Sequence, residues 1–363
     1  MALLQHDGFD HYGAINLVSA ALPGTIQWVS SGYEQPTYTL QTNIAYGKNA
    51  GSLGLALAAQ SGAQYIWVKK AIRPESNNTG AAWAPQKRLV LGFAARFPLA
   101  LTGNIQFLKI GGVSVNIASD WFIYVDGVQT SYQCELNIWN FVEVVFDLEA
   151  NKFRLYMTDV LVLEKDITNP VLDFYEIRAQ IITGSGAGQI LLHADDLYLL
   201  DGNPLTWDGK ATSNVDRIGK CNTLARYQTA DSIVQMTPLS GTTNFSMVNQ
   251  ATPDGDTSYV SSNVPGATDL YTNLTAFTTV DDAAIRAVTI APSVRMLEPD
   301  SLSVTAVVKV DTAEAVGYRM KLKAASYSSE KHIFENSPKT NAPWTPTEAL
   351  NMKFGHRLLP KPS

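Results

Sequence analysis

The residues that would carry the most demanding chemistry in this sequence are the carboxylates Glu143 and Asp147, in the β-rich run Trp139–Asp147. A retaining glycosidase needs two carboxyl groups about 5 Å apart. Strand alternation places Glu143 and Asp147 on one face but roughly 13 Å apart along it, and Glu149 falls in the following turn. We therefore interpret this acidic face as a solvated sheet surface and keep a glycosidase as the third functional hypothesis.

The other residues that bind metals or cofactors lack the necessary spacing. None of the five histidines has a metal-ligand spacing, and we expect His193, on a strand before Asp195 and Asp196, to be packed rather than ligating. Asp254-Gly255-Asp256 offers oxygens for calcium but fits an Asp-Gly turn and lacks the rest of an EF-hand loop. Gly184–Gly188 fits neither a dinucleotide fingerprint nor a nucleophile elbow. We predict no catalytic residue, no metal and no cofactor.

Two tryptophans lie in segments that are predicted to be loops. Trp83 lies in Ala81–Pro85, and Trp344 stands between Pro343 and Thr345. Loop tryptophans can anchor a neighbouring chain or stack on a sugar ring. We expect Trp83 and Trp344 to form an interface, with protein contact favoured over glycan contact.

Composition excludes several classes of function. Among 363 residues, 27 basic and 33 acidic side chains give a net charge of −6, which argues against sequence-independent nucleic-acid binding. No apolar run approaches the ~20 residues that span a bilayer, and no secretory signal is expected at the start. Cys134 and Cys221 are the only cysteines; we expect both to be reduced thiols, made in a reducing cytosol.

The elements that must position these residues are strands. Trp121–Val125 and Val128–Tyr132 are joined by Asp126-Gly127, a two-residue hairpin signal. Short alternating runs with turn signals every 8–12 residues continue to about residue 200 and are typical of a β-sandwich. Gly, Asn and Pro near 201–204 predict a boundary. We predict an all-β protein with a β-sandwich over 1–202 and a second, smaller β domain over 203–335.

The C-terminal segment 336–363 is rich in proline and is predicted to be an extended arm with one short helix. Thr345-Pro346-Thr347-Glu348 forms a capping box with Pro at the first helical position. The helix is expected to continue for two or three turns, up to Gly355. Such an arm would order on a neighbouring subunit.

Several segments, taken in order, resemble structural proteins of tailed bacteriophage particles that begin with a laminin-G-like (concanavalin A-like) jelly roll. In the first domain these are Asp7–Tyr12, Gly51–Leu55, Leu89–Phe97, Trp139–Asp147 and Asp195–Gly202. In the rest of the chain they are Asp216–Ile218, Asp254–Val260, Ile285–Val288, Asn341–Glu348 and Phe354-Gly355. The resemblance implies a jelly-roll fold for 1–202 and a virion component. It transfers no catalytic residue, and the metal-ligand pattern of lectin members is not visible.

The sequence therefore predicts a non-enzymatic bacteriophage virion structural protein, made in the host cytoplasm. Its place would be the tail, a tail fibre, the collar or the capsid exterior as a decoration protein. Its partners would be other virion proteins and copies of itself as a homo-oligomer, without nucleic acid or membrane insertion. The alternative is a glycan-binding module that recognises the host surface.

Overall fold

The chain is described by a computed structural model. The description covers residues 2–7, 28–31, 38–42, 53–58, 66–72, 85, 87–183, 189–206, 209–212, 214, 216–241, 243–250, 254–273, 284–297, 302–320 and 327–360. Within these ranges the secondary structure is predominantly β-strand, with one short α-helix near the C-terminus. The predicted all-β fold is therefore confirmed.

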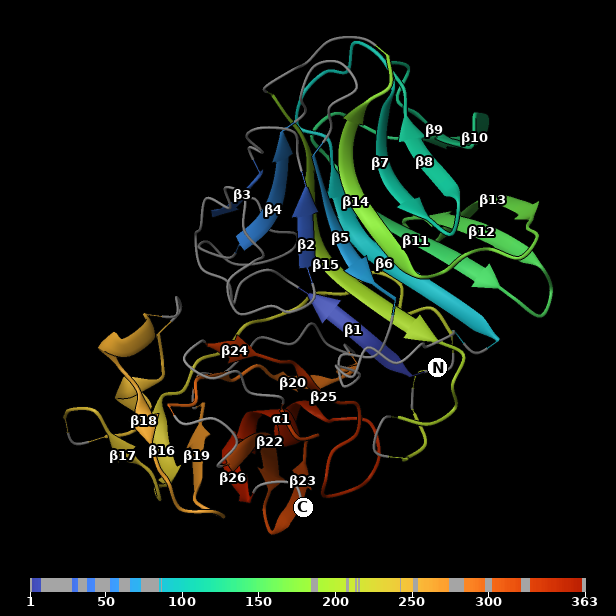
Figure 1. Ribbon diagram of the computed structural model, residues 1–363. Coiled ribbons are helices and arrows are strands. Elements are labelled where there is room, and N and C mark those ends of the chain that lie inside the picture. The colour runs from blue at the N-terminus through green and yellow to red at the C-terminus, as the bar shows by residue number, and fades with distance from the viewer. Residues whose placement is uncertain are drawn as a thin grey trace.

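The first body is a sandwich of two antiparallel sheets, drawn in the upper part of Figure 1. Within the described residues, one sheet has eight strands in the order β13-β12-β11-β6-β15-β4-β3, with β1 added beside β15. These strands are β1 (Leu3–Asp7), β3 (Tyr38–Thr42), β4 (Leu53–Ala58), β6 (Arg88–Arg96), β11 (Trp139–Asp147), β12 (Lys152–Met157), β13 (Val160–Asp166) and β15 (Ile190–Asp201).

The facing sheet has seven strands among the described residues, in the order β10-β9-β8-β7-β14-β5-β2. They are β2 (Trp28–Ser31), β5 (Ile66–Ala71), β7 (Ile105–Ile110), β8 (Val113–Ile117), β9 (Phe122–Val125), β10 (Val128–Gln133) and β14 (Phe174–Ile181). The core lies between the sheets because alternate residues point inward: Phe153, Leu155 and Met157 of β12 are buried, whereas the residues between them are half-buried.

The predicted Asp126-Gly127 hairpin is present. Asp126 has φ +47° and Gly127 has φ +82°, the left-handed pair that a type I′ turn requires. Val125 pairs with Val128 across the turn. Local sequence therefore fixes the register at this edge of the seven-stranded sheet.

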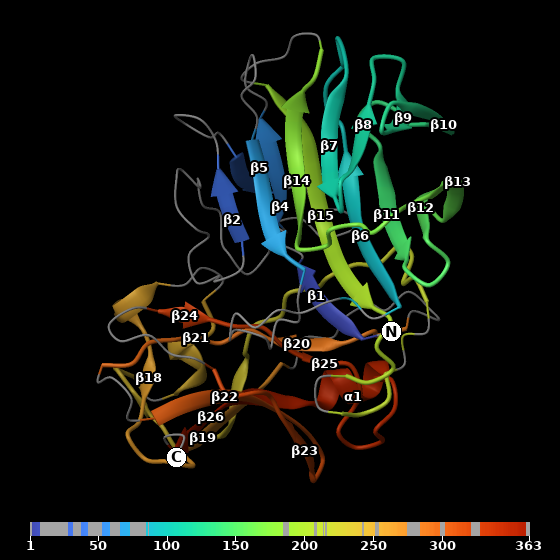
Figure 2. The same ribbon diagram turned by 45° about the vertical axis from the view of Figure 1, so that its right-hand side comes forward.

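The second body is built on a smaller sheet in the order β16-β19-β26-β22-β23. Its strands are β16 (Ala230–Ile233), β19 (Thr268–Thr272), β22 (Leu302–Val310), β23 (Ala313–Val316) and β26 (Lys353–Pro360). The shorter elements around it are β17 (Thr237–Pro238), β18 (Val260–Ser261), β20 (Val288–Ile290), β21 (Ser293–Val294), β24 (Ser328–Ser329), β25 (His332–Phe334), η2 (Phe245–Met247), η3 (Gly255–Thr257) and α1 (Pro346–Asn351). Both views show β1 of the sandwich lying between the two bodies (Figures 1 and 2). The division at residue 202 itself stays a prediction.

The C-terminal segment is not an arm over the described residues up to 360. The capping box is confirmed, with Thr345 and Glu348 bonded reciprocally, but α1 ends at Asn351 because Met352 already has extended backbone. The chain then continues as β26, which pairs with β19 on one side and β22 on the other. Phe354 and Leu358 of β26 are buried in the second body. The prolines indicated an extended chain correctly, but alternating apolar residues between them make it an internal strand.

No helix in the described ranges is long and apolar enough to cross a membrane.

Candidate functional site

The acidic face of β11 is covered rather than solvated. Glu143 is 0% exposed and stands opposite Gly92 of β6, which in turn stands opposite Tyr198 of β15. The Tyr198 hydroxyl donates to one Glu143 oxygen, and Arg217 forms an ion pair with the other. The expectation of a solvated surface at Glu143 is therefore corrected, because residues beyond the sandwich close over it.

The residues that close over it form a covering segment, 216–223. The Ile218 amide donates to the Tyr198 oxygen at 3.2 Å, and the Gly219 amide donates to Glu143 Oε1 at 3.0 Å. Burial raises the pKa of Tyr198 well above its usual range. The phenol therefore stays protonated and acts as a hydrogen-bond donor, and the cluster joins the covering segment to the sheet.

Asp147, the second carboxylate of β11, is held by two cations. Arg88 lies 3.1 Å and Arg154 3.0 Å from Asp147 Oδ2. Burial raises its pKa, but the Ala150 amide and the two arginines outweigh this and hold the pKa below its usual range. Arg88 also contacts Asp216 of the covering segment at 3.1 Å. Asp147 is therefore a fixed anion of the junction rather than a proton donor.

A second set of buried polar contacts joins β1 to β25. Lys331 Nζ lies 2.9 Å from Asp7 Oδ2, and both side chains are buried. Glu335 accepts from the Leu3 amide at 3.1 Å and from Thr212 at 2.6 Å. Burial raises the pKa of the Glu335 carboxyl. The start of the chain is thus tied to residues more than 300 positions away.

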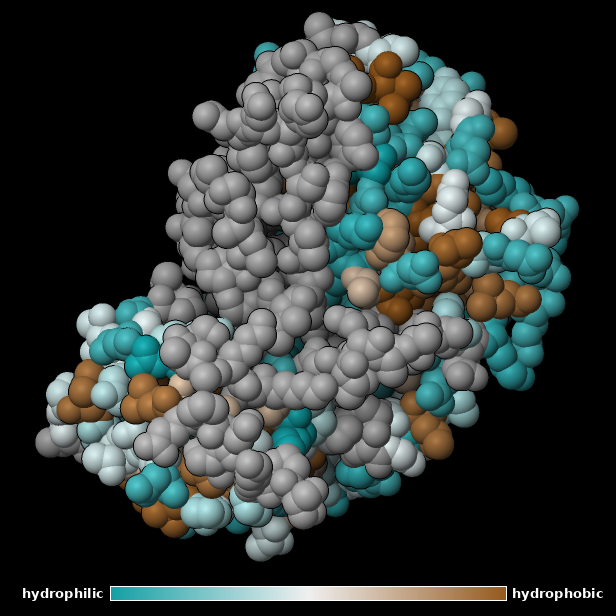
Figure 3. All heavy atoms as spheres, viewed as in Figure 1, coloured by the Kyte–Doolittle hydropathy of each residue, from teal (hydrophilic) through white to brown (hydrophobic). Residues whose placement is uncertain are grey.

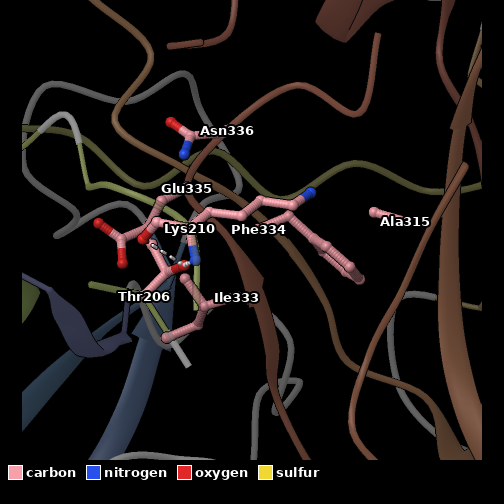
Figure 4. A pocket seen from close by; sticks show the side chains of 7 residues that line it. All are labelled: Thr206, Lys210, Ala315, Ile333, Phe334, Glu335 and Asn336. Carbon is pink, nitrogen blue, oxygen red and sulfur yellow. Dashed lines mark hydrogen bonds between the residues drawn. The ribbon is translucent and has the colours of Figure 1, made fainter. Parts of the chain in front are cut away.

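Figure 4 shows a hollow that lies beside the buried contacts of Glu335. It is lined by Thr206, Lys210, Ala315, Ile333, Phe334, Glu335 and Asn336. Its enclosed volume of about 10 Å³ leaves room for roughly one water molecule, whereas typical small-molecule sites occupy roughly 300–1,000 Å³. The carboxylate that lines it, Glu335, already accepts hydrogen bonds from the Leu3 amide and from Thr212. The hollow is therefore a gap in the packing between neighbouring segments.

The outer face of the seven-stranded sheet carries a polar row: Gln106 of β7, Asn116 of β8 and Tyr124 of β9. Gln180 of β14 pairs with Gln106 and accepts from Arg178 at 2.8 Å. The Asn116 Oδ1 atom is buried and has no hydrogen-bond partner among the residues that the structure describes. Figure 3 shows hydrophilic side chains over β14 and β7, beside the grey atoms. Arg178 already pairs with Glu176, and Tyr124 donates to Asp120 at 2.9 Å. Among the described residues, the Asn116 oxygen is therefore the group of this row that can still accept a hydrogen bond from a polar ligand.

Of the two tryptophans that were predicted to form an interface, the structure describes Trp344. Trp83, like Gly184–Gly188, lies outside the described residues. Trp344 is 3% exposed, packs in the core of the second body and donates from Nε1 to the Phe334 carbonyl at 2.8 Å. It is therefore a core residue, and its expected interface role is corrected. Asp256, in the suggested calcium segment, pairs instead with Arg295 at 2.6 Å.

Both cysteines are free thiols, as expected, with Cys134 buried in the sandwich core. In the part of the chain that the structure describes, no group of three or more His, Cys, Asp or Glu side chains is arranged to hold a metal ion.

No protein-family model and no curated protein matches this sequence. Among solved structures, the chain is similar to a sialidase, with 14% identity, a TM-score of 0.37 and coverage of 56% of this chain and 19% of that one. It is similar to the receptor binding domain of botulinum neurotoxin D, with 14% identity, a TM-score of 0.34 and coverage of 53% and 50%. It is also similar to the binding domain of Paraclostridial Mosquitocidal Protein 1, with 10% identity, a TM-score of 0.34 and coverage of 53% of this chain and 49% of that one. The chain thus matches half or less of each structure, and these similarities do not determine its function.

Proposed function

We propose that this chain is a non-enzymatic structural protein of a bacteriophage particle. It is made in the host cytoplasm, and it binds other virion proteins and copies of itself in the tail, a fibre, the collar or the capsid exterior. The order of sequence segments that resemble such proteins supports the phage origin. The observation that carries the structural role is the polar junction, in which Asp7 pairs with Lys331 and the Leu3 amide donates to Glu335, so that β1 of the sandwich is joined to the second body.

The junction supports this role because it opposes movement between the bodies. Asp7 is fully buried, and separating it from Lys331 leaves an uncompensated charge, at a cost of about 3–5 kcal/mol. Hinge motion would break several such contacts at once. A rigid two-body unit with broad outer surfaces is suited to a protein that holds its neighbours in a fixed arrangement within an assembly.

The test is the composition of the particle. Antibodies raised against the purified chain should label virions of the phage that carries its gene, and mass spectrometry of gradient-purified virions should detect the chain. Immunogold labelling would then distinguish tail, collar and capsid positions. Virions that lack the chain, with the chain present only in the infected-cell lysate, would overturn the proposal.

The polar row of the seven-stranded sheet favours a second candidate function, the binding of a host-surface glycan. Asn116 has a buried oxygen without a partner in the described part of the chain, and removing a matched hydrogen-bonding group costs about 1–3 kcal/mol. On a glycan array, Asn116→Ala should weaken any wild-type hit about fivefold or more. Gln129→Ala, on exposed β10 of the same sheet, is the matched control. An array without wild-type hits would remove this candidate.

A further inference from the structure

One end of the sandwich carries an arginine set among apolar side chains. Trp139, Arg96 and His193 stand side by side across β11, β6 and β15. Arg96 donates from Nε and Nη2 to His193 Nδ1 at 3.1 and 2.8 Å. Its guanidinium carbon lies 5.1 Å from the centroid of the Trp139 ring. The guanidinium is therefore held in place by two aromatic side chains.

The charge of Arg96 is not neutralised by these contacts. Burial lowers the pKa of His193 to about 4, so its ring is neutral at pH 7. Arg154, which also belongs to this sheet, contacts a carboxylate, whereas Arg96 forms no ion pair with any described residue. Asp195, which lies further along β15, is fully buried and accepts from its neighbour's amide. A half-buried cation of this kind attracts a carboxylate from another molecule.

Exposed apolar residues follow directly on these strand ends. Ile138, beside Trp139, is 51% exposed, and Leu136 and Leu99 are exposed as well. The Asn137 amide donates to the Phe97 carbonyl at 2.9 Å, which brings the two segments together. Tryptophan and arginine inside an apolar rim are the composition of an interface hot spot. Arg96, Leu99, Leu136, Ile138 and Trp139 are named the Arg96 end.

The opposite end of the sandwich offers a complementary loop. Asp173 is exposed between Val171, which is 68% exposed, and Phe174, which is also exposed. Within the described ranges, Asp173 and Glu135 are the exposed carboxylates without a hydrogen bond or ion pair to a side chain. Glu135 adjoins Leu136 in the Arg96 end itself. Asp173 is therefore the carboxylate without a side-chain partner that stands beside exposed apolar side chains, with the Lys69 ammonium 3.0 Å from the centroid of the Phe174 ring. Residues 171–174 are named the Asp173 loop.

The two sites lie at opposite ends of the strands. β6 ends at Arg96, and the chain re-enters the other sheet at Ile105, which pairs with Ile181 at the end of β14. Phe174 is the first residue of that same strand. Figure 1 shows β14 running from one end of the sandwich to the other. Different surfaces that complement each other produce a head-to-tail contact, which closes as a ring or extends as a filament.

We propose that a second copy of this chain docks head to tail, with the carboxylate of its Asp173 loop on Arg96 and its Val171 and Phe174 against Leu136 and Ile138. The proposal rests on the proposed function, because it specifies the self-association that an assembly protein of this kind uses. It needs no ligand beyond the chain itself.

Charge reversal in the full chain tests the contact. Arg96→Glu and Asp173→Arg should each weaken self-association by about tenfold or more, measured by sedimentation velocity over a concentration series. The double variant should restore association to within a few-fold of wild type. Arg286→Glu changes an exposed arginine on the second body and is the matched control, which should behave as wild type. Because Asp173 lies on an exposed loop, its variant keeps the test valid if Arg96→Glu unfolds.

Three results would overturn the inference. These are a wild-type chain that stays monomeric at every concentration, single variants that associate as wild type does, and a double variant that is no better than either single one. The function is tested separately by virion labelling, so association that is insensitive to Arg96 and Asp173 would refute this interface alone.

Discussion

Gly92 lies directly under the ring of Tyr198: a Cβ atom on Gly92 would stand 2.3 Å from Tyr198 Cε1. The two residues face each other across β6 and β15, and Glu143 faces Gly92 from β11. Because Gly92 has no side chain, the tyrosine ring crosses β6 and its hydroxyl reaches Glu143. One missing side chain thus positions the cluster that joins the covering segment to the sandwich.

Gly92→Ala should destabilise the protein by about 1–3 kcal/mol, because the added methyl group displaces a buried aromatic ring. Urea unfolding followed by tryptophan fluorescence measures the change. In a Tyr198→Ala background the same substitution should cost much less, since the ring that it displaces is gone. Equal costs in both backgrounds would show that Gly92 is needed for another reason.

Glu143→Gln should lower the free energy of unfolding by about 1.5–3 kcal/mol, because the half-buried Arg217 loses the anionic acceptor of a charge-assisted hydrogen bond. Asp159→Asn is the matched control: Asp159 contacts the same arginine at 3.5 Å, but its side chain is 51% exposed. An exposed pair contributes at most about 1 kcal/mol. Equal stability of the two variants would show that Glu143 does not fix the covering segment to the sandwich.

His332 should make stability fall in acid. Its ring is fully buried against Tyr318, neither nitrogen has a hydrogen-bond partner within the described ranges, and burial lowers its pKa from 6.5 to about 3. Below pH 6.5 the unfolded chain therefore binds a proton at this residue, whereas the folded chain binds that proton only near pH 3. Between these values stability should drop by about 1.4 kcal/mol per pH unit from this group.

The measurement is urea unfolding at several pH values for wild type and His332→Leu. The variant should lose this part of the pH slope, whatever its packing cost at neutral pH. His193, whose pKa burial lowers to about 4, acts in the same direction in both proteins and serves as the internal reference. Identical slopes in both proteins would contradict the assignment to His332.

Cys134 should not react with a thiol reagent in the native protein at pH 8. It is buried in the sandwich core, and burial raises the pKa of its thiol to about 12, so almost no thiolate is present. Cys221 is half-buried in the covering segment and should be modified first. Peptide mapping after iodoacetamide treatment, with and without urea, distinguishes the two. Native labelling of Cys134 ahead of Cys221 would contradict the packing described.

Much of the local structure could be predicted from the sequence. The Asp126-Gly127 turn needs only positive φ at two residues that tolerate it. The Thr345–Glu348 capping box needs only side chains three residues apart. Strand alternation likewise depends on neighbours along the chain, which is why the predicted runs Trp121–Val125, Val128–Tyr132 and Trp139–Asp147 lie close to the bounds of β9, β10 and β11.

The polar junction could not be predicted in the same way. Arg217 lies 74 residues from Glu143, and Lys331 lies 324 residues from Asp7. A period-two pattern shows that Glu143 points away from the sandwich core, but not what lies on that side. The only local signal was Gly92 within an otherwise bulky strand, which marks a close approach by another group.

By itself, the sequence determined the strands between residues 121 and 147, the Asp126-Gly127 turn and the capped start of the one helix, because their geometry depends on residues within a few positions of each other. The tertiary structure alone decided that Glu143 and Trp344 are buried and that Lys353–Pro360 lies between two strands of a sheet. The physical reason is that burial and strand pairing depend on which distant segment packs against a face, and that choice minimises exposed apolar surface and unpaired charge over the whole chain.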